Sequence, residues 1–142
     1  MKRKIVSLLL TFLSLFMVAF AACEKETGSP AWFGLEVVSI TETEVVFRGV
    51  GNSNGWLSES MELLKKNGKL TYEISGGMVT SINGKANSAN EFWMLYTSDT
   101  EMANTAWGTY EYEGQTLGSA IVGAEALPVV DGGIYIWAYQ GF

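Results

Sequence analysis

Short strand-like segments separated by glycines occupy most of the chain beyond residue 34, and they constrain the fold more than any other feature. The segments are rich in β-branched and aromatic residues, which favour β-strands, and the sixteen glycines offer frequent places to turn. Asn83-Gly84 can supply the positive φ angles of a tight hairpin turn. The expected strands span residues 35–40, 45–50, 70–75, 78–82, 91–97, 107–113 and 134–139.

One segment, residues 58–66, carries the signals of an α-helix. Leu57, Met61 and Leu64 recur at helical spacing and form an apolar stripe, and Ser58 is a suitable N-cap. A helix of about three turns is not stable alone in water, so its stripe must pack on a sheet. We therefore expect an α+β fold, a single β-grasp-like domain in which a twisted, mainly antiparallel sheet wraps around one short helix.

Residues 1–22 have the order of a secretory signal: three basic residues, an uncharged apolar run over residues 5–20, and two alanines. The next residue, Cys23, is the only cysteine, and a lone cysteine in an exported chain has no partner within its own molecule. Phe20-Ala21-Ala22-Cys23 resembles the bacterial lipobox, with Phe20 where that motif usually has Leu. We expect a signal peptide that is removed and a lipid on Cys23. A cleaved signal without lipid and a retained signal anchor are the alternatives.

Lipidation would hold the mature chain on the cell membrane, facing the extracellular side. Residues 23–31 then form a tether. Its eight residues after the cysteine reach under about 30 Å even when fully extended, at about 3.3–3.6 Å per residue. The β-domain, residues 32–142, would lie close to the membrane surface.

The charge of the chain argues against nucleic acid as a partner. The leader carries three of the nine Lys and Arg residues, so its removal leaves six against fifteen Asp and Glu, a formal net charge of −9. Binding to phosphate backbones depends on clustered Lys and Arg. We expect the acidic surface to keep an exported protein soluble.

The chain contains no histidine, which removes His-dependent nucleophilic catalysis and His-ligated zinc. With Cys23 lipidated, thiol chemistry is removed as well. Two carboxylate pairs, Glu111 with Glu113 and Asp99 with Glu101, are of the type that a glycosidase uses. Such pairs are ordinary solvated residues in an acidic protein, so we expect no enzyme, no catalytic residue, no metal site and no required cofactor.

Aromatic residues cluster on the expected strands. Along residues 91–97, alternation places Phe92, Met94 and Tyr96 on one face and Trp93 and Leu95 on the other. If one face covers the helix, aromatic rings on the other would form an exposed platform for a flat or amphipathic ligand. This argument adds Trp107 to the candidate ligand-binding residues.

A resemblance to a known family rests on two segments, Met78 to Gly84 and Glu91 to Tyr96, separated by a polar loop. Their sequences, MVTSING and EFWMLY, are similar to the signature of the transcobalamin-like C-terminal domain family, the β-domain of the cobalamin carriers transcobalamin and intrinsic factor. The resemblance covers roughly residues 57–139. It implies a β-grasp-like fold and ligand capture without chemistry, and the positions that match the carrier segment near the ligand are Ser88, Asn90, Phe92 and Trp93.

The carriers enclose the corrin ring between this domain and a helical barrel, so the resemblance implies that a lone β-domain offers half of a site. We therefore expect a non-catalytic, lipid-anchored, extracellular ligand-binding module that captures cobalamin or another corrinoid near a membrane importer. A second domain or the importer would close the site. The alternative is a surface interaction or adhesion module that recognises protein or glycan, and the carboxylate-only glycosidase is a third class.

Replacing Cys23 by Ser should abolish the incorporation of radiolabelled palmitate in a bacterial host, because the thiol that accepts the acyl chain is removed. Ser29→Ala, a substitution in the same tether, is the matched control and should be labelled like the parent chain. Unchanged labelling of Cys23→Ser would contradict the lipid anchor.

Overall fold

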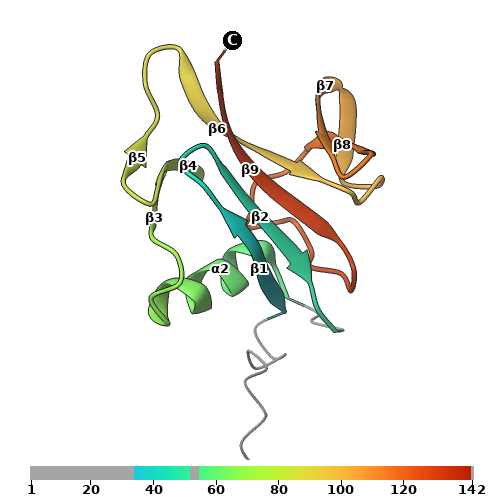
Figure 1. Cartoon of the computed structure of the whole chain (residues 1–142), viewed down its shortest axis with the longest axis horizontal. Coiled ribbons are helices and arrows are strands. Elements are labelled where there is room, and N and C mark those ends of the chain that lie inside the picture. The colour runs from blue at the N-terminus through green and yellow to red at the C-terminus, as the bar shows by residue number, and fades with distance from the viewer. Residues whose placement is uncertain (1–33, 52–54, 142) are drawn as a thin grey trace, which may run out of the picture.

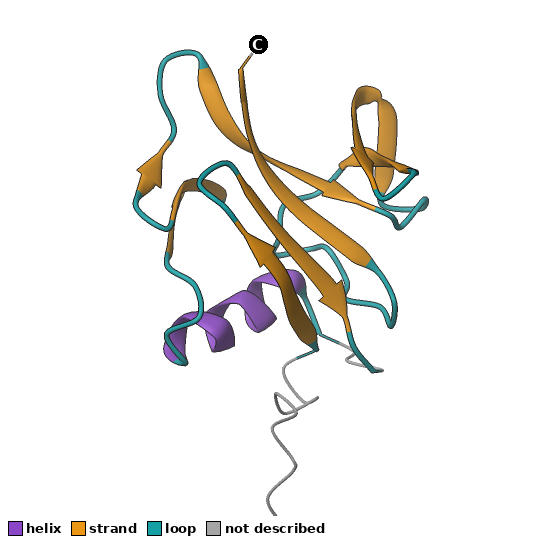
Figure 2. Cartoon of the chain, in the orientation of Figure 1, coloured by secondary structure: helices purple, strands orange, loops and turns teal. Residues whose placement is uncertain are grey.

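The computed structural model describes residues 34–51 and 55–141, and in these residues the chain forms two antiparallel β-sheets and one helix (Figures 1 and 2). Strands account for 53% of them and helix for 10%, so the domain is mostly β. The leader, Cys23 and the tether lie outside these residues. The elements are β1 (Leu35–Ile40), β2 (Glu44–Gly49), α2 (Leu57–Lys66), β3 (Tyr72–Ser75), β4 (Met78–Ile82), β5 (Lys85–Ala86), β6 (Glu91–Thr97), β7 (Ala103–Tyr112), β8 (Gln115–Ala120) and β9 (Ile134–Gly141).

The larger sheet has six strands in the order β1-β2-β9-β6-β8-β7, and the smaller has three in the order β3-β4-β5. The last strand, β9, lies in the middle of the larger sheet, between β2 and β6 (Figure 1). Its ladder with β6 runs without a register shift from Glu91↔Gly141 to Thr97↔Tyr135. The smaller sheet shares no strand pairing with the larger one, so the two are joined by side-chain packing and by hydrogen bonds from the Trp93 indole and the Tyr139 hydroxyl to carbonyls of β5.

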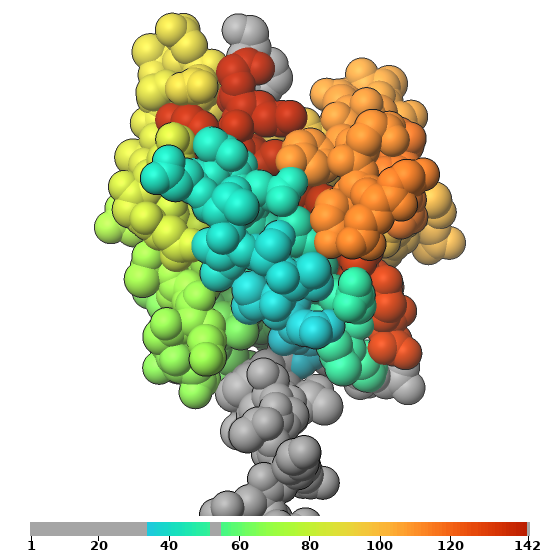
Figure 3. Space-filling view, viewed as in Figure 1, coloured from blue at the N-terminus to red at the C-terminus, as the bar shows by residue number. Residues whose placement is uncertain are grey.

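The larger sheet buries apolar side chains on both of its faces, because residues alternate between faces along each strand. On one side, the helix face, the sheet packs against α2 and the smaller sheet. On the other side, the hairpin face, it packs against the β7–β8 hairpin, which appears in orange beside β1 and β2 in Figure 3. The helix face includes Val45, Phe47, Trp93, Leu95, Tyr135 and Trp137. The hairpin face includes Val46, Tyr96, Ile134, Ile136 and Ala138.

The β-grasp-like α+β fold expected from the sequence is wrong. The helix has ten residues and packs against one face of the larger sheet, rather than being wrapped by it (Figure 2). Two features account for the difference. Residues 72–86 pair among themselves as a separate sheet, and the β7–β8 hairpin covers the opposite face, where the Tyr96 and Tyr110 rings lie 5.3 Å apart between centroids.

The helix begins one residue before the predicted segment, and its N-cap is Trp56, not Ser58. The Trp56 backbone N–H donates to the Glu59 carboxylate at 2.9 Å. The Leu57 and Ser58 backbone N–H groups donate to carbonyls of the loop that precedes β9, at 2.8 and 3.0 Å. This loop therefore satisfies the free N–H groups that a serine cap would otherwise have to satisfy.

Most predicted strands are present, and the Asn83-Gly84 turn is confirmed by φ angles of 48° and 81°. The sequence did not reveal β5 and β8. The second of these, Gln115–Ala120, contains Gly118 and Ser119 where β-branched residues are expected. Gly118 is needed because a Cβ there would lie 2.9 Å from the Cβ of Ala103 on β7. Because β7 approaches closely, β8 has a glycine where a β-branched residue would have indicated a strand, and its composition therefore did not predict one.

Gly49→Ala should lower the free energy of unfolding by about 1–3 kcal/mol, the usual range for overpacking. Gly49 is hydrogen-bonded to Gly132 and Gly133, and an added Cβ would lie 1.9 Å from the Val130 carbonyl oxygen. Gly123→Ala is the matched control, because its Cβ would lie 3.5 Å from the nearest atom. Urea unfolding measures both, and equal losses would contradict the close packing at Gly49.

Candidate functional site

The five candidate ligand-binding residues lie in different surroundings. Ser88 and Asn90 are exposed in the β5–β6 loop. The Ser88 hydroxyl oxygen accepts hydrogen bonds from the backbone N–H groups of Asn90 and Glu91, at 3.4 and 3.1 Å. Phe92 and Trp93 alternate along β6 and so point to opposite faces of the sheet. Trp107 is on β7, at the far edge of the sheet order. The role of each in binding stays a prediction.

Most aromatic residues that were candidates for an exposed platform are covered. On β6, Trp93 is 5% exposed and Tyr96 is 4% exposed, because α2 with the smaller sheet and the β7–β8 hairpin cover the two faces. Among the large apolar residues exposed in the described part of the chain, the aromatic ones are Trp56 and Trp107. The expectation of a free aromatic face failed because a hairpin from the same sheet folds back over it.

An apolar cavity of about 160 Å³, the intersheet cleft, lies between the two sheets. The β3–β4 hairpin forms one wall. The middle of β6, the end of β8 and Trp137 of β9 form the opposite wall, and the loop that follows β8 closes one side. Of the five predicted residues, Trp93 lines this cleft.

Strand pairing explains why a cleft exists at this place. β8 pairs with β6 only at Tyr96 and Thr97, so the two strands separate beside Leu95. The β3–β4 hairpin covers the gap but does not pair with either strand. At one side the hairpin turn meets the loop after β8 closely, since a Cβ on Gly123 would lie 3.5 Å from the Gly77 carbonyl oxygen.

Two tryptophans line the cleft, and their indole N–H groups differ. Both side chains are 5% exposed. The Trp93 indole donates to the Lys85 carbonyl at 2.8 Å. The Trp137 indole nitrogen is buried and has no hydrogen-bond partner in the part of the chain that the structure describes. It is the one buried side-chain nitrogen or oxygen atom there without a partner. Buried donors are paired in nearly all proteins, so the unpaired Trp137 donor is an exception. The cleft itself, with its apolar lining, is the candidate binding site.

The carboxylates of the two candidate pairs occupy strand and turn positions in the described residues. No group of three or more Asp, Glu, His or Cys side chains there could hold a metal ion. Glu111 lies on β7, and its carboxylate accepts a hydrogen bond from the Thr116 hydroxyl, whereas Glu113 lies in the following turn with a φ of 48°. Glu113 is therefore not a second strand residue on the face of Glu111. Asp99 accepts the Glu101 backbone N–H at 3.0 Å and so belongs to a turn.

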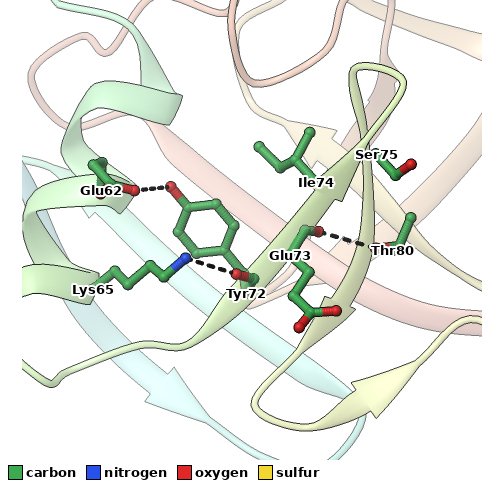
Figure 4. Close-up of a pocket in the computed structure, with 7 residues that line it drawn as sticks. All are labelled: Glu62, Lys65, Tyr72, Glu73, Ile74, Ser75 and Thr80. Carbon is green, nitrogen blue, oxygen red and sulfur yellow. Dashed lines mark hydrogen bonds between the residues drawn. The ribbon is translucent and has the colours of Figure 1, made fainter.

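A second, more open cavity of about 490 Å³ lies between α2 and β3 (Figure 4). Its polar groups satisfy one another: the Tyr72 hydroxyl donates to Glu62 at 3.0 Å, and the Lys65 ammonium donates to the Tyr72 carbonyl at 3.1 Å (Figure 4). Burial and the hydrogen bond to Glu62 raise the pKa of Tyr72 to about 12. These contacts hold the helix to the smaller sheet, so the intersheet cleft is the stronger candidate.

Residues 58–115 match a family described as a domain of unknown function, DUF4430. The match covers less than half of the chain, from α2 to the first residue of β8. Its description names no ligand and does not establish a transcobalamin-like family. No curated protein and no solved structure matches the chain. In the residues that the structure describes, no helix is long and apolar enough to cross a membrane.

Trp93→Phe and Trp137→Phe form a matched pair, because the two indoles are equally buried and lose the same atoms. Trp93→Phe should lower the free energy of unfolding by about 1 kcal/mol more, since only this change breaks a hydrogen bond, the one from the indole to the Lys85 carbonyl. Urea unfolding of both variants is the measurement. Equal losses would show that the Trp137 indole N–H has an acceptor in solution.

Proposed function

We propose that this protein is a non-catalytic, extracellular ligand-binding module, held on the cell membrane by a lipid on Cys23. The observation that carries the binding function is the intersheet cleft, a mainly apolar cavity lined by Trp93 and Trp137. Apolar cavities with a few placed polar groups are the usual form of small-molecule sites. The basic and apolar leader before a single cysteine supports the anchor.

The size of the cleft supports capture of part of a ligand. At about 160 Å³ it is smaller than the roughly 300–1,000 Å³ typical of pockets that enclose drug-sized molecules. A larger ligand would therefore insert one group and leave the rest outside. Affinity depends on how completely a ligand is buried, so a second surface, from an importer or another domain, would be needed for tight binding.

The ligand that we propose is cobalamin or another corrinoid. The support is the resemblance of residues 78–96 to the transcobalamin-like C-terminal domain family, and the DUF4430 match overlaps the same residues without naming a ligand. A corrinoid would bind by a peripheral group in the cleft and by contacts with the exposed β5–β6 loop. Cobalt would not be coordinated by a histidine, because the chain has none.

A specific observation favours the alternative of a surface interaction module. On β7 the register with β8 jumps from Asn104↔Ser119 to Thr109↔Gly118, so residues 105–108 have no partner on β8. Trp107 lies in this bulge and is 63% exposed. Tryptophan is enriched among the residues that dominate protein interfaces, and its ring is suited to stacking contacts. A protein or glycan that binds the β7 bulge would define this second function.

Calorimetric titration of the full chain in detergent with cyanocobalamin and cobinamide should give saturable binding at micromolar strength. Gly123→Val should weaken it at least tenfold, because its side chain would narrow the cleft between Gly123 and Gly77. Trp107→Ala tests the fifth candidate residue separately, because Trp107 lies in the β7 bulge and does not line the cleft: unchanged binding would place the ligand in the cleft alone.

No heat of binding at millimolar corrinoid would contradict the named ligand. Binding that is lost in Trp107→Ala but kept in Gly123→Val would assign the site to the β7 bulge. In that case a panel of glycans and surface proteins, tested with the same two variants, becomes the measurement that identifies the partner.

A further inference from the structure

We infer that the β7–β8 hairpin is a docking surface for a basic segment of a partner protein, and that an arginine of this segment stacks on the Trp107 indole. The surface is separate from the intersheet cleft, so the inference goes beyond the proposed ligand-binding function and does not depend on it. Three observations lead to this partner: the exposure of Trp107, the support beneath the hairpin and the distribution of charge over the domain.

Trp107 is an exposed aromatic residue on an edge strand. β7 lies last in the order of the larger sheet and has one neighbour, β8. Residues 105–108 have no partner on β8, and the Trp107 side chain in this bulge is 63% exposed. Most of the surface of this residue is therefore available to a partner without any change in the core.

The hairpin that carries Trp107 is fixed to the larger sheet on its inner side. Leu117 of β8 is fully buried in the core of the hairpin face. The Tyr110 ring packs on Tyr96, and the Tyr110 hydroxyl donates a hydrogen bond to the Glu44 carboxylate on β2. Because the folded protein already orders the hairpin, a partner that docks on its outer side loses little affinity to ordering it.

The outer side of the hairpin carries carboxylates. Neighbouring residues on a strand point to opposite faces, so Glu111 points away from the side on which Tyr110 packs. Glu111 is exposed, and Glu101 and Glu113 are exposed in the turns at the two ends of β7. Each of the three lies within six residues of Trp107 in the chain, which is about 20 Å along an extended strand. One short segment could therefore contact the ring and a carboxylate together.

The fold keeps the basic residues away from this hairpin. All seven charged residues beyond residue 86 are acidic. The described basic residues lie on or just after α2, on β5 and on β2, and they are Lys65, Lys66, Lys69, Lys85 and Arg48. α2 and the β7–β8 hairpin lie at opposite corners of the domain (Figures 1 and 3), and the Arg48 guanidinium is paired with Glu36 at 3.3 Å. Among the described residues, the hairpin carboxylates have no ion-pair partner.

The ring and the charge together favour arginine as the contacting group. Tryptophan is the aromatic side chain that binds cations best, and a planar guanidinium can stack on an indole and pair with a carboxylate. A bulge in an edge strand disfavours the addition of a further strand. We therefore expect side-chain contacts, not strand addition, from a partner segment that runs from Trp107 towards the Glu113 turn. The same carboxylates would repel an anionic partner.

The test is a two-dimensional ¹H–¹⁵N spectrum of the full chain, labelled with ¹⁵N-tryptophan and kept in detergent. The probes are three hexapeptides with blocked ends, in which threonine alternates with arginine, lysine or glutamate. The arginine peptide should shift the Trp107 indole resonance in a saturable manner, the lysine peptide should bind more weakly, and the glutamate peptide should not bind. Trp107→Phe identifies the resonance by its loss. Added salt should weaken binding, because exposed charges are screened.

Fluorescence anisotropy of a labelled arginine peptide gives the affinity of each variant. Trp107→Ala should weaken binding about two- to fivefold, the range for an exposed cation–π contact. Glu111→Gln combined with Glu113→Gln should weaken it about threefold or more, since two exposed ion pairs are lost. Glu73→Gln combined with Glu91→Gln is the matched control, because it removes the same charge from exposed positions on β3 and β6. This control should bind the peptide like the parent chain.

A Trp107 resonance that stays in place with the arginine peptide, or equal losses in the two double variants, would overturn the inference. A neutral oligosaccharide that shifts the Trp107 resonance when the arginine peptide does not would also overturn it, and would assign the β7 bulge to a glycan. Gly123→Val narrows the intersheet cleft and should bind the peptide like the parent chain. Loss of corrinoid binding and loss of peptide binding are therefore separate results.

Discussion

The central position of β9 is the constraint on which the rest of the structure depends. This strand is last in the chain, yet it pairs antiparallel with β2 on one side and β6 on the other. Alternation carries Tyr135 and Trp137 into the core on the helix face, and Ile134 and Ile136 into the core on the hairpin face. Both cores therefore need the C-terminal strand in place, and α2, too short to be stable alone, depends on the sheet that β9 completes.

The candidate site follows from a limit of this arrangement. In the six-stranded sheet β6 and β8 pair only at Tyr96 and Thr97, and the smaller sheet covers the gap beyond them without joining the ladder. The side chains between the two sheets fill that gap incompletely, which leaves an apolar cleft. The Trp137 indole N–H has no acceptor among the described residues. A buried donor without an acceptor lowers the stability of the folded protein.

Local patterns were sufficient for much of the secondary structure. The stripe of Leu57, Met61 and Leu64 lies buried on α2 as predicted, and Asn83-Gly84 adopts the positive φ angles of its turn. β8 was missed because Gly118 serves a contact with another strand, not local strand preference. For the site, the sequence indicated Trp93, which lines the cleft, but did not distinguish Trp137, because a free indole N–H depends on which carbonyls the fold brings near it.

The sequence by itself determined the mostly strand-like character of the domain, the helix that contains Leu57, Met61 and Leu64, the acidic charge and the absence of histidine, since each follows from residue type and short-range spacing. Only the tertiary structure decided that the strands form two sheets, that a hairpin covers the second aromatic face, and that a cleft opens between the sheets. These outcomes depend on pairing between segments far apart in the chain. The local sequence pattern of a strand is the same whichever strand it pairs with. The pairing nevertheless decides whether a side chain such as Trp107 or Trp137 lies in the core, in the cleft or in solvent.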